Sequence, residues 1–394
     1  MQYARHTDLP EPDEASARHS RRVFDYIAEC IRESGGSISF AEFMQHALYA
    51  SGLGYYAAGA TKFGDAGDFV TAPEISGVFG RVIARQCAHT LAQLDRGSIL
   101  EFGAGSGKLA ADVLAKLHTL DALPERYRIL EVSADLCARQ RAFLHERIPE
   151  LVDRVEWLSD LPETHTGVVL ANEVLDAMPV ERFVRREEGI LQQCVKVGGR
   201  GFEFETRAAP DRLRDAVRHI EGSLGHKLKD GYMSEVSLGI GEWISGLGRC
   251  LDAGCVLLFD YGGTRREFFA EDRSTGWLRC HFRHRAHSDP LRLPGIQDIT
   301  AWVEFTALAE AAVDAGFEIA GYVPQSLFLA AGGLEQEMQD LCSRSADQQL
   351  ALSAQIKTLT LPGEMGENIK CIGLLRGDLQ RPPAFELGDR THTL

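Results

Sequence analysis

Short apolar runs alternate with amphipathic stretches from residue 98 onward, and this alternation predicts an α/β fold. Helical periodicity fills the gaps between the first and second runs and between the second and third. Strands separated by helices at this spacing are typical of βαβ units and a parallel sheet. The pattern therefore predicts one seven-stranded, doubly wound, Rossmann-like sheet. The expected strands cover residues 98–105, 126–133, 153–160, 167–174, 254–263, 317–323 and 368–377.

The N-terminal part of the chain predicts helices and a long loop in place of strands. Apolar residues at four-residue spacing predict an amphipathic helix over 20–33. Ser39 and Glu42 have the spacing of a capping box, which opens a second helix ending near residue 49. Residues 51–73 are dense in Gly, Ala, Tyr and Phe without a regular period, so we expect an ordered loop followed by a helix over 75–94.

Two insertions interrupt the predicted sheet. Residues 180–210 alternate polar and apolar positions around two turns, which predicts an antiparallel meander, and helices follow to about residue 250. Residues 264–300 are rich in Arg, His and Pro and lie between the fifth expected strand and the next helix. The expected parts are N-terminal helices with a cofactor-covering loop (1–96), the first half of the core (97–179), an inserted α+β subdomain (180–250), the second half of the core (251–377) and a tail (378–394).

Charge and composition narrow the classes of partner. Lys and Arg number 42 against 57 Asp and Glu, so the net charge of −15 argues against a nucleic-acid backbone or an anionic membrane. No apolar run approaches the length of a membrane span, so we expect no membrane insertion. The nine cysteines show no CxxC pair, and the N-terminus lacks the features of a signal or transit peptide. These observations predict a cytoplasmic protein with reduced thiols.

A glycine-rich turn follows the first expected strand and opens a helix, where the backbone can approach a ligand closely. Phe102 and Leu109 exclude a Walker A loop, and Lys108 stands where the dinucleotide fingerprint requires glycine. What remains, from Glu101 onward, is the Glu-x-Gly-x-Gly-x-Gly pattern of class I methyltransferases. The glycines are Gly103, Gly105 and Gly107.

Two acids after the next strands complete a predicted site for S-adenosylmethionine, which carries a sulfonium, a carboxylate and a ribose diol. Glu131 ends the second strand and is placed to accept hydrogen bonds from both ribose hydroxyls. Asp160 follows the third strand and is placed to meet the adenine amino group. Each residue also has a purely structural explanation. Glu131 could be a surface acid at the end of a strand, and Asp160 could belong to an ordinary turn.

The fourth strand ends in polar residues at the sheet edge where ligands bind in open α/β folds. Asn172 is assigned to the cofactor, and Glu173 and Asp176 can orient and polarise a nitrogen of the methyl acceptor. Helix capping by Asp176 and a buried hydrogen bond from Asn172 are the structural alternatives. Asp260 ends the fifth strand at the same edge.

Several segments resemble the MidA family of S-adenosylmethionine-dependent methyltransferases, and the likeness spans residues 37–375. The segments are 67–76 (GDFVTAPEIS), 101–108 (EFGAGSGK), 171–176 (ANEVLD), 260–262 (DYG) and 294–300 (PGIQDIT). The resemblance implies the class I methyltransferase fold. The mitochondrial member of the family is a protein arginine methyltransferase and an assembly factor of respiratory complex I. The resemblance therefore implies a protein substrate, such as a respiratory complex subunit.

In such an enzyme, residues 67–76 are expected to form a lid on the cofactor, with an apolar face and few polar groups. The lid residues assigned to the cofactor are Phe69, Thr71, Pro73 and Glu74. An arginine acceptor is protonated near neutral pH, so Glu173 and Asp176 would hold the cation and accept a proton. The usual arginine methyltransferases differ, because their two glutamates lie in a longer loop after the same strand.

Two further features leave alternatives open. Cys280, His281, His284 and His287 have arginine neighbours and no nearby acid, so we expect a loop that closes over the active site and no metal. Apolar residues at helical spacing over 334–358 predict core contacts or a homodimer. A non-catalytic assembly factor or chaperone, and a small-molecule methyltransferase, are the alternatives to a protein methyltransferase.

Overall fold

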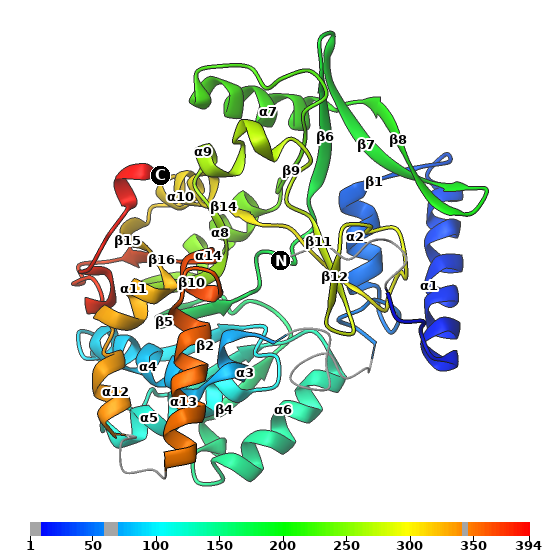
Figure 1. The fold of residues 1–394 in the computed structure, drawn as a ribbon. Coiled ribbons are helices and arrows are strands. Elements are labelled where there is room, and N and C mark those ends of the chain that lie inside the picture. The colour runs from blue at the N-terminus through cyan, green and yellow to red at the C-terminus, as the bar shows by residue number, and fades with distance from the viewer. Residues whose placement is uncertain (1–8, 59–69, 341–345) are drawn as a thin grey trace. The chain divides into compact units, whose positions relative to one another are not determined.

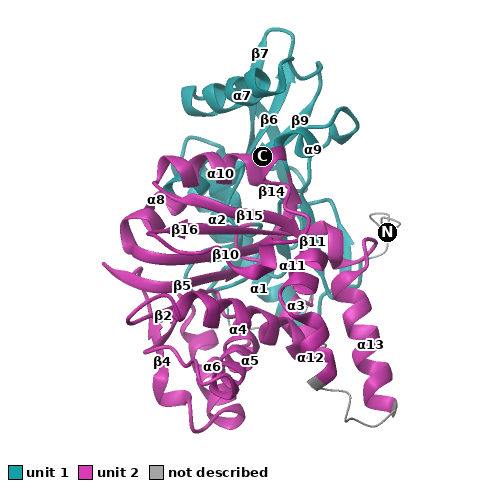
Figure 2. Cartoon of the chain, turned by 90° about the vertical axis from the view of Figure 1, so that its left-hand side faces the viewer, with its two compact units in different colours: residues 1–69, 176–242, 264–304 teal, residues 70–175, 243–263, 305–394 magenta. Residues whose placement is uncertain are grey.

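The computed structural model describes residues 9–58, 70–340 and 346–394 (Figure 1). The chain divides into two compact units, each assembled from separate stretches of sequence (Figure 2). Unit 1 comprises residues 1–69, 176–242 and 264–304, and unit 2 comprises residues 70–175, 243–263 and 305–394.

The seven predicted strands lie side by side in unit 2, in the order β15-β16-β10-β5-β2-β3-β4. All seven expected strands are present, which confirms the α/β fold class. They are β2 (Ser98–Phe102), β3 (Tyr127–Leu130), β4 (Val155–Leu158), β5 (His165–Asn172), β10 (Leu251–Gly263), β15 (Glu318–Pro324) and β16 (Ile369–Arg376).

The prediction of a wholly parallel sheet is wrong for one strand, because β16 pairs antiparallel with both β10 and β15. The helices between β15 and β16 leave the sheet and return to the same edge, since Pro324 at the end of β15 lies opposite Lys370 at the start of β16. A connection that crossed to the other edge would have made β16 parallel.

Helices cover both faces of the unit 2 sheet. In Figure 2, α4 and α5 lie on one side of it and α8 and α10 on the other. Phe79, Leu114, Leu257 and Phe328 are fully buried in the core formed with α4 and α5, and Phe385 from the C-terminal segment packs edge-on against Phe328. The helices are α3 (Ala72–Ile75), α4 (Gly77–Leu91), α5 (Lys108–Thr119), α6 (Ala134–Arg147), α8 (Ile240–Cys250, of which 243–250 belong to unit 2), α10 (Phe305–Asp314), α11 (Gln325–Ala331), α12 (Leu334–Asp340), α13 (Ala346–Thr360) and α14 (Met365–Asn368).

Unit 1 contains the predicted meander within a five-stranded sheet of order β1-β7-β6-β9, with β8 paired to β7. The capping box of Ser39 and Glu42 is confirmed at the start of α2. The first helix begins earlier than predicted, at Glu14, because Asp13 caps it by accepting the Ser16 N–H at 2.9 Å. The elements are α1 (Glu14–Glu33), β1 (Ile38–Ser39), α2 (Phe40–Tyr49), β6 (Glu181–Arg186), β7 (Gly189–Gly198), β8 (Gly201–Ala208), α7 (Asp211–Leu224), β9 (Met233–Val236), α9 (Arg265–Phe268) and β14 (Val303–Glu304).

Residues 264–300, in which the sequence analysis expected only a loop over the Arg/His part, contain a three-stranded antiparallel sheet. The strands are β11 (Arg279–Phe282), β12 (Arg285–His287) and β13 (Asp298–Thr300). Arg283 and His284 form the turn between β11 and β12 with φ of 48° and 59°. Two-residue hairpin turns of this hand are usually made by Asn-Gly or Asp-Gly, so the sequence carried no hairpin signal.

Candidate active site

The glycine turn between β2 and α5 needs glycine for conformational reasons. Gly103, Gly105 and Gly107 have φ of 59°, 55° and 87°, a left-handed region that side chains disfavour. The turn leads directly into α5 at Lys108, so backbone N–H groups at the start of that helix face the position expected for the cofactor. This geometry fits a ligand that the backbone approaches closely.

Substituting valine for Gly105 is expected to lower affinity for S-adenosylhomocysteine at least about 100-fold, because a β-branched residue is strained there and its side chain would occupy the approach to the turn. Calorimetry measures the dissociation constant. Gly316→Val is the matched control, with a φ of 83° in the same unit and only the Arg376 side chain near its added Cβ. Equal affinities for Gly105→Val and wild type would disprove the assignment of the turn.

Glu131 lies just past the end of β3 and is half-buried. Its Oε1 accepts the Ser133 N–H at 2.9 Å, and its Oε2 accepts Nε2 of Gln140 at 3.2 Å. Gln140 also donates to the Gly105 carbonyl at 3.0 Å, which links the predicted ribose acid to the glycine turn. Asp160 is exposed, and the Ser159 hydroxyl donates to its Oδ2 at 2.7 Å.

Glu101 is enclosed in the sheet, with only 2% of its surface exposed. The Tyr127 hydroxyl donates to its Oε2 at 2.7 Å. Burial, together with the charge of Glu131, raises the pKa of Glu101 to about 7, although the hydrogen bond from Tyr127 acts in the opposite direction. Glu101 therefore carries a proton in the folded protein at mildly acidic pH, whereas it would be ionised there in the unfolded chain.

Replacing Glu101 by glutamine tests this proton directly. The raised pKa means that the native state binds more protons than the unfolded chain between its ordinary value of 4.5 and about 7, so Glu101 lowers stability as pH rises. Glutamine stays neutral, so relative to wild type the variant should gain about 2–3 kcal/mol of unfolding free energy between pH 5 and pH 8. Urea unfolding at the two pH values gives the comparison. A difference independent of pH would mean that Glu101 is ionised throughout.

The described part of the expected lid packs onto the glycine turn. The Ser106 hydroxyl donates to the Glu74 carboxylate, and Nζ of Lys108 donates to the Glu74 carbonyl at 2.8 Å. Pro73 is buried in the first turn of α3, which Thr71 precedes. Phe69 lies outside the described residues. Glu74 therefore lies against the glycine turn, and Thr71 and Pro73 belong to the same short segment.

Glu173 follows β5 in a strained backbone conformation, with a φ of 51° that non-glycine residues rarely adopt. Its Oε1 accepts Nδ2 of Asn172 and the Ala72 N–H, both at 3.2 Å. The carboxylate therefore joins the end of β5 to α3. Such strain persists only where the surroundings impose it, and it concentrates at functional sites.

Two neighbours of Glu173 carry further information. Asn172 has a buried Oδ1 with no hydrogen-bond partner among the described residues, so this acceptor is available to a ligand donor. Asp260, which is 1% exposed, accepts the N–H groups of Val174 and Leu175 through Oδ2 at 3.2 and 2.8 Å. Asp260 thus holds the turn that follows Glu173, which is a positioning role.

Asp176 belongs to unit 1, where it is 8% exposed. Near it in that unit the Tyr56 hydroxyl donates to Oδ1 of Asp298 at 2.8 Å, and Tyr49 stacks on Tyr56 at 5.5 Å. Burial raises the pKa of Tyr56 far above its usual range, and the charges of Asp298 and Asp176 add to the effect. The sequence prediction missed Tyr49, Tyr56 and Asp298, although two of them lie in segments it had singled out.

The Arg/His segment forms the β11–β12 hairpin, where the sequence analysis expected a loop. Cys280 is fully buried in β11. Burial, together with the nearby charges of His287 and Arg279, lowers the pKa of His281 to about 4. Across residues 9–58, 70–340 and 346–394, no group of three or more His, Cys, Asp or Glu is placed to hold a metal ion.

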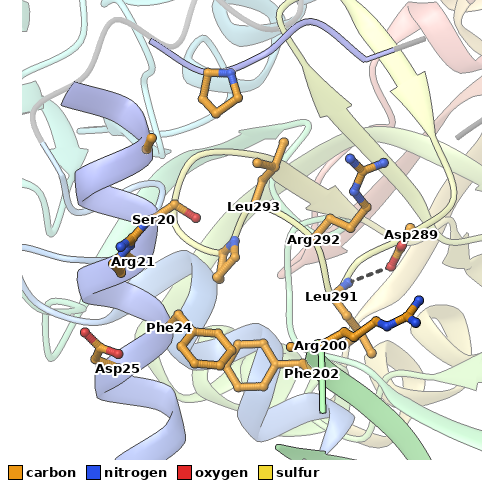
Figure 3. Close-up of a pocket in the computed structure, with 14 residues that line it drawn as sticks. Ser20, Arg21, Phe24, Asp25, Arg200, Phe202, Asp289, Leu291, Arg292 and Leu293 are labelled. Carbon is orange, nitrogen blue, oxygen red and sulfur yellow. Dashed lines mark hydrogen bonds between the residues drawn. The ribbon is translucent and has the colours of Figure 1, made fainter. Parts of the chain in front are cut away.

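Unit 1 contains a cavity of about 940 Å³ (Figure 3). Phe24 of α1 and Phe202 of β8 pack on its wall with ring centroids 4.4 Å apart. Arg21 and Arg292 also line it. No residue predicted to bind the cofactor or the acceptor lines this cavity, so it is not the candidate active site.

The mixed sheet, the left-handed glycine turn after β2 and the acid after β3 define a class I S-adenosylmethionine-dependent methyltransferase. A family model described as "Putative S-adenosyl-L-methionine-dependent methyltransferase" matches residues 82–323, and the chain belongs to this family. These findings confirm the resemblance to the MidA family, the cofactor and the enzyme class.

Solved structures and curated proteins give the same answer. A Burkholderia thailandensis protein crystallised with S-adenosyl-homocysteine is 38% identical, with a TM-score of 0.93 over 98% of this chain and 100% of that one. A Danio rerio protein named "Protein arginine methyltransferase NDUFAF7, mitochondrial" is 28% identical over 92% of this chain and 88% of its own length. The Homo sapiens protein of the same name is 26% identical over 87% and 81%.

The relatives also bear on location. The expectation of a cytoplasmic protein is wrong by this comparison, because the relatives from Danio rerio, Drosophila melanogaster and Homo sapiens are all named as mitochondrial proteins. No helix among the described residues is long and apolar enough to cross a membrane.

Proposed function

We propose that this chain transfers the methyl group of S-adenosylmethionine to a guanidinium nitrogen of an arginine in a protein. The main support is the conformation of Glu173. Its carboxylate follows a strained backbone at the edge of the sheet where chemistry occurs in this fold. The arginine acceptor is supported by the names of the curated relatives.

The residues present fit the cofactor. The left-handed glycines admit its close approach, and the unpartnered Oδ1 of Asn172 offers an acceptor to one of its donors. The cofactor, when bound, supplies an electrophilic methyl group on a sulfonium. Gly103, Gly105 and Gly107 hold the methionine part, Glu131 the ribose and Asp160 the adenine, while Thr71, Pro73 and Glu74 cover it. Glu101 supports the glycine turn from inside the sheet.

The chain's own acids handle the acceptor. The Asn172 and Ala72 donors fix Oε1 of Glu173 and so fix the plane of its carboxylate. This carboxylate binds the guanidinium cation and directs one nitrogen at the methyl group. The acceptor nitrogen would lose a proton on methylation, and Glu173 would accept that proton. Asp176 adds a second negative charge on the acceptor side.

Two finer points extend the proposal. The resemblance to the MidA family supports a respiratory complex I subunit as the acceptor protein and a role in assembly of that complex. A homodimer is supported by apolar residues that α13 and its C-terminal end leave exposed, Leu350 at 73% and Leu361 at 47%. Sedimentation of the purified chain tests the dimer, and a single monomeric species at micromolar concentration would disprove it.

Isotope-labelled S-adenosylmethionine tests the reaction. Lysate from a strain that lacks this gene is incubated with labelled cofactor and either wild-type protein or Glu173→Gln. A protein methyltransferase places label in one protein band with wild type only. Label in the small-molecule fraction would instead indicate a small-molecule methyltransferase, and absence of transfer despite measured cofactor binding would indicate a non-catalytic assembly factor.

A further inference from the structure

Gln140 is a buried glutamine whose side-chain amide joins the ends of three successive strands. It lies on α6 with none of its surface exposed. Its Nε2 donates to the Gly105 carbonyl at 3.0 Å and to Oε2 of Glu131 at 3.2 Å, and its Oε1 accepts Nε1 of Trp157 at 2.9 Å. These partners follow β2, follow β3 and lie in β4, respectively.

The chemistry of the three partners fixes the orientation of this amide. The indole N–H of Trp157 can only donate, while a carbonyl and an ionised carboxylate can only accept. If the amide oxygen and nitrogen of Gln140 were exchanged, the oxygen would face two other acceptors, the Gly105 carbonyl and the Glu131 carboxylate. The amide nitrogen would then face the Trp157 N–H, which is another donor. Both amide hydrogens are therefore directed at the glycine turn and at Glu131.

The Glu131 carboxylate receives one of these donors on Oε2 and the Ser133 N–H on Oε1 at 2.9 Å. One donor on each oxygen fixes the plane of the carboxylate. A carboxylate oxygen can accept more than one hydrogen bond, so these donors are compatible with ribose hydroxyls on the same carboxylate. The same amide ties this carboxylate to Gly105, so the ribose and methionine ends of the site share one support.

We propose that Gln140 is a positioning residue that orients Glu131 toward the ribose diol, and that it thereby sets a preference for ribose over deoxyribose in the cofactor. The inference rests on the role proposed above for Glu131. It assigns no chemical step to Gln140, which acts through Glu131 and Gly105.

The test compares S-adenosylhomocysteine with its 2′-deoxy analogue by calorimetry. Wild type should prefer the ribose ligand. Gln140→Leu should weaken binding of the ribose ligand roughly 10- to 100-fold, the scale of a hydrogen bond to a charged group, and should weaken the deoxy ligand much less. The preference therefore shrinks. Equal weakening of both ligands, or unchanged binding of both, would overturn the proposal.

Gln140→Glu provides a second variant of nearly the same shape. At pH 8 it sets two carboxylates against each other, so ribose-ligand affinity should fall at least as far as in Gln140→Leu. At pH 6 a proton shared between the two carboxyl groups restores a donor, and at least about fivefold of the affinity should return. An affinity that does not recover at the lower pH would contradict the orienting role.

Gln86 supplies the matched control in the same unit. It is 2% exposed, its Nε2 donates to the Val82 and Gly332 carbonyls at 3.3 and 2.9 Å, and its Oε1 accepts the Ala384 N–H at 3.1 Å. Gln86→Leu should lower the melting temperature and leave both ligand affinities unchanged. Glu131→Ala separates the two proposals, because normal ribose preference in that variant would remove the role of Glu131 itself.

Discussion

Replacing Glu173 by glutamine is expected to lower kcat by roughly 10²- to 10⁴-fold with little change in cofactor affinity. General-base assistance has about this value, and a group that acts on the acceptor matters chiefly in the transition state. The substitution is conservative, because glutamine can keep the oxygen that accepts from Asn172 and the Ala72 N–H. Single-turnover methyl transfer and calorimetric titration with S-adenosylhomocysteine measure the two quantities.

The outcomes for Glu173→Gln separate its candidate roles. Normal turnover would remove the acceptor role. Lost cofactor affinity would instead move Glu173 to the cofactor site. Asp176→Asn is the companion variant. It is expected to lose less activity than Glu173→Gln if Asp176 serves mainly as a helix cap, because asparagine can also cap a helix.

Replacing Glu337 by glutamine should lower the free energy of unfolding by about 3 kcal/mol at pH 7, the scale of a broken buried ion pair. The Glu337 side chain is fully buried on α12 and faces Nε of Arg81 at 2.6 Å and Nζ of Lys116 at 2.8 Å, with Arg85 on the same carboxylate. Burial alone would raise the pKa of Glu337, but the hydrogen bonds from Lys116 and Arg85 and the charge of Arg81 lower it.

The sign of the pH dependence follows from that lowered pKa. The ionised form is stabilised in the fold, so its contribution is present above the ordinary value of 4.5 and is lost as pH falls through the lowered value. The difference between wild type and Glu337→Gln in urea should therefore shrink at acidic pH. Glu156→Gln is the control, since Arg126 and Arg128 pair with a half-exposed carboxylate, and it should cost under about 1 kcal/mol. Equal losses in the two variants would contradict this account.

The features that could be predicted from the sequence are those that depend on a local pattern of residues. The seven strands of unit 2 follow apolar runs, and Ser39 with Glu42 predicted the start of α2 because a capping box depends on two residues alone. The direction of β16 was not predictable, since a strand has the same apolar pattern in either direction. The β11–β12 hairpin was not predicted, because Arg283 and His284 occupy the turn positions where glycine or asparagine would indicate a hairpin.

The candidate site was predictable only in part, for a related reason. Gly105 and Glu131 could be predicted as site residues because they belong to a contiguous motif and to a strand end. Gln140 was missed because nothing in α6 distinguishes it before the fold brings it to Gly105, Glu131 and Trp157. Tyr56 and Asp298 were missed similarly, since their contact joins residues 242 positions apart in the chain.

The central claim is methyl transfer to a protein arginine, and the chemical identity of the labelled residue tests it most directly. Protein labelled by wild-type enzyme with isotopic S-adenosylmethionine is hydrolysed to amino acids and analysed by mass spectrometry. The account predicts label in methylarginine, and none when Glu173→Gln replaces the wild-type enzyme. Label in methyllysine or a methyl ester, with methylarginine unlabelled, would contradict it.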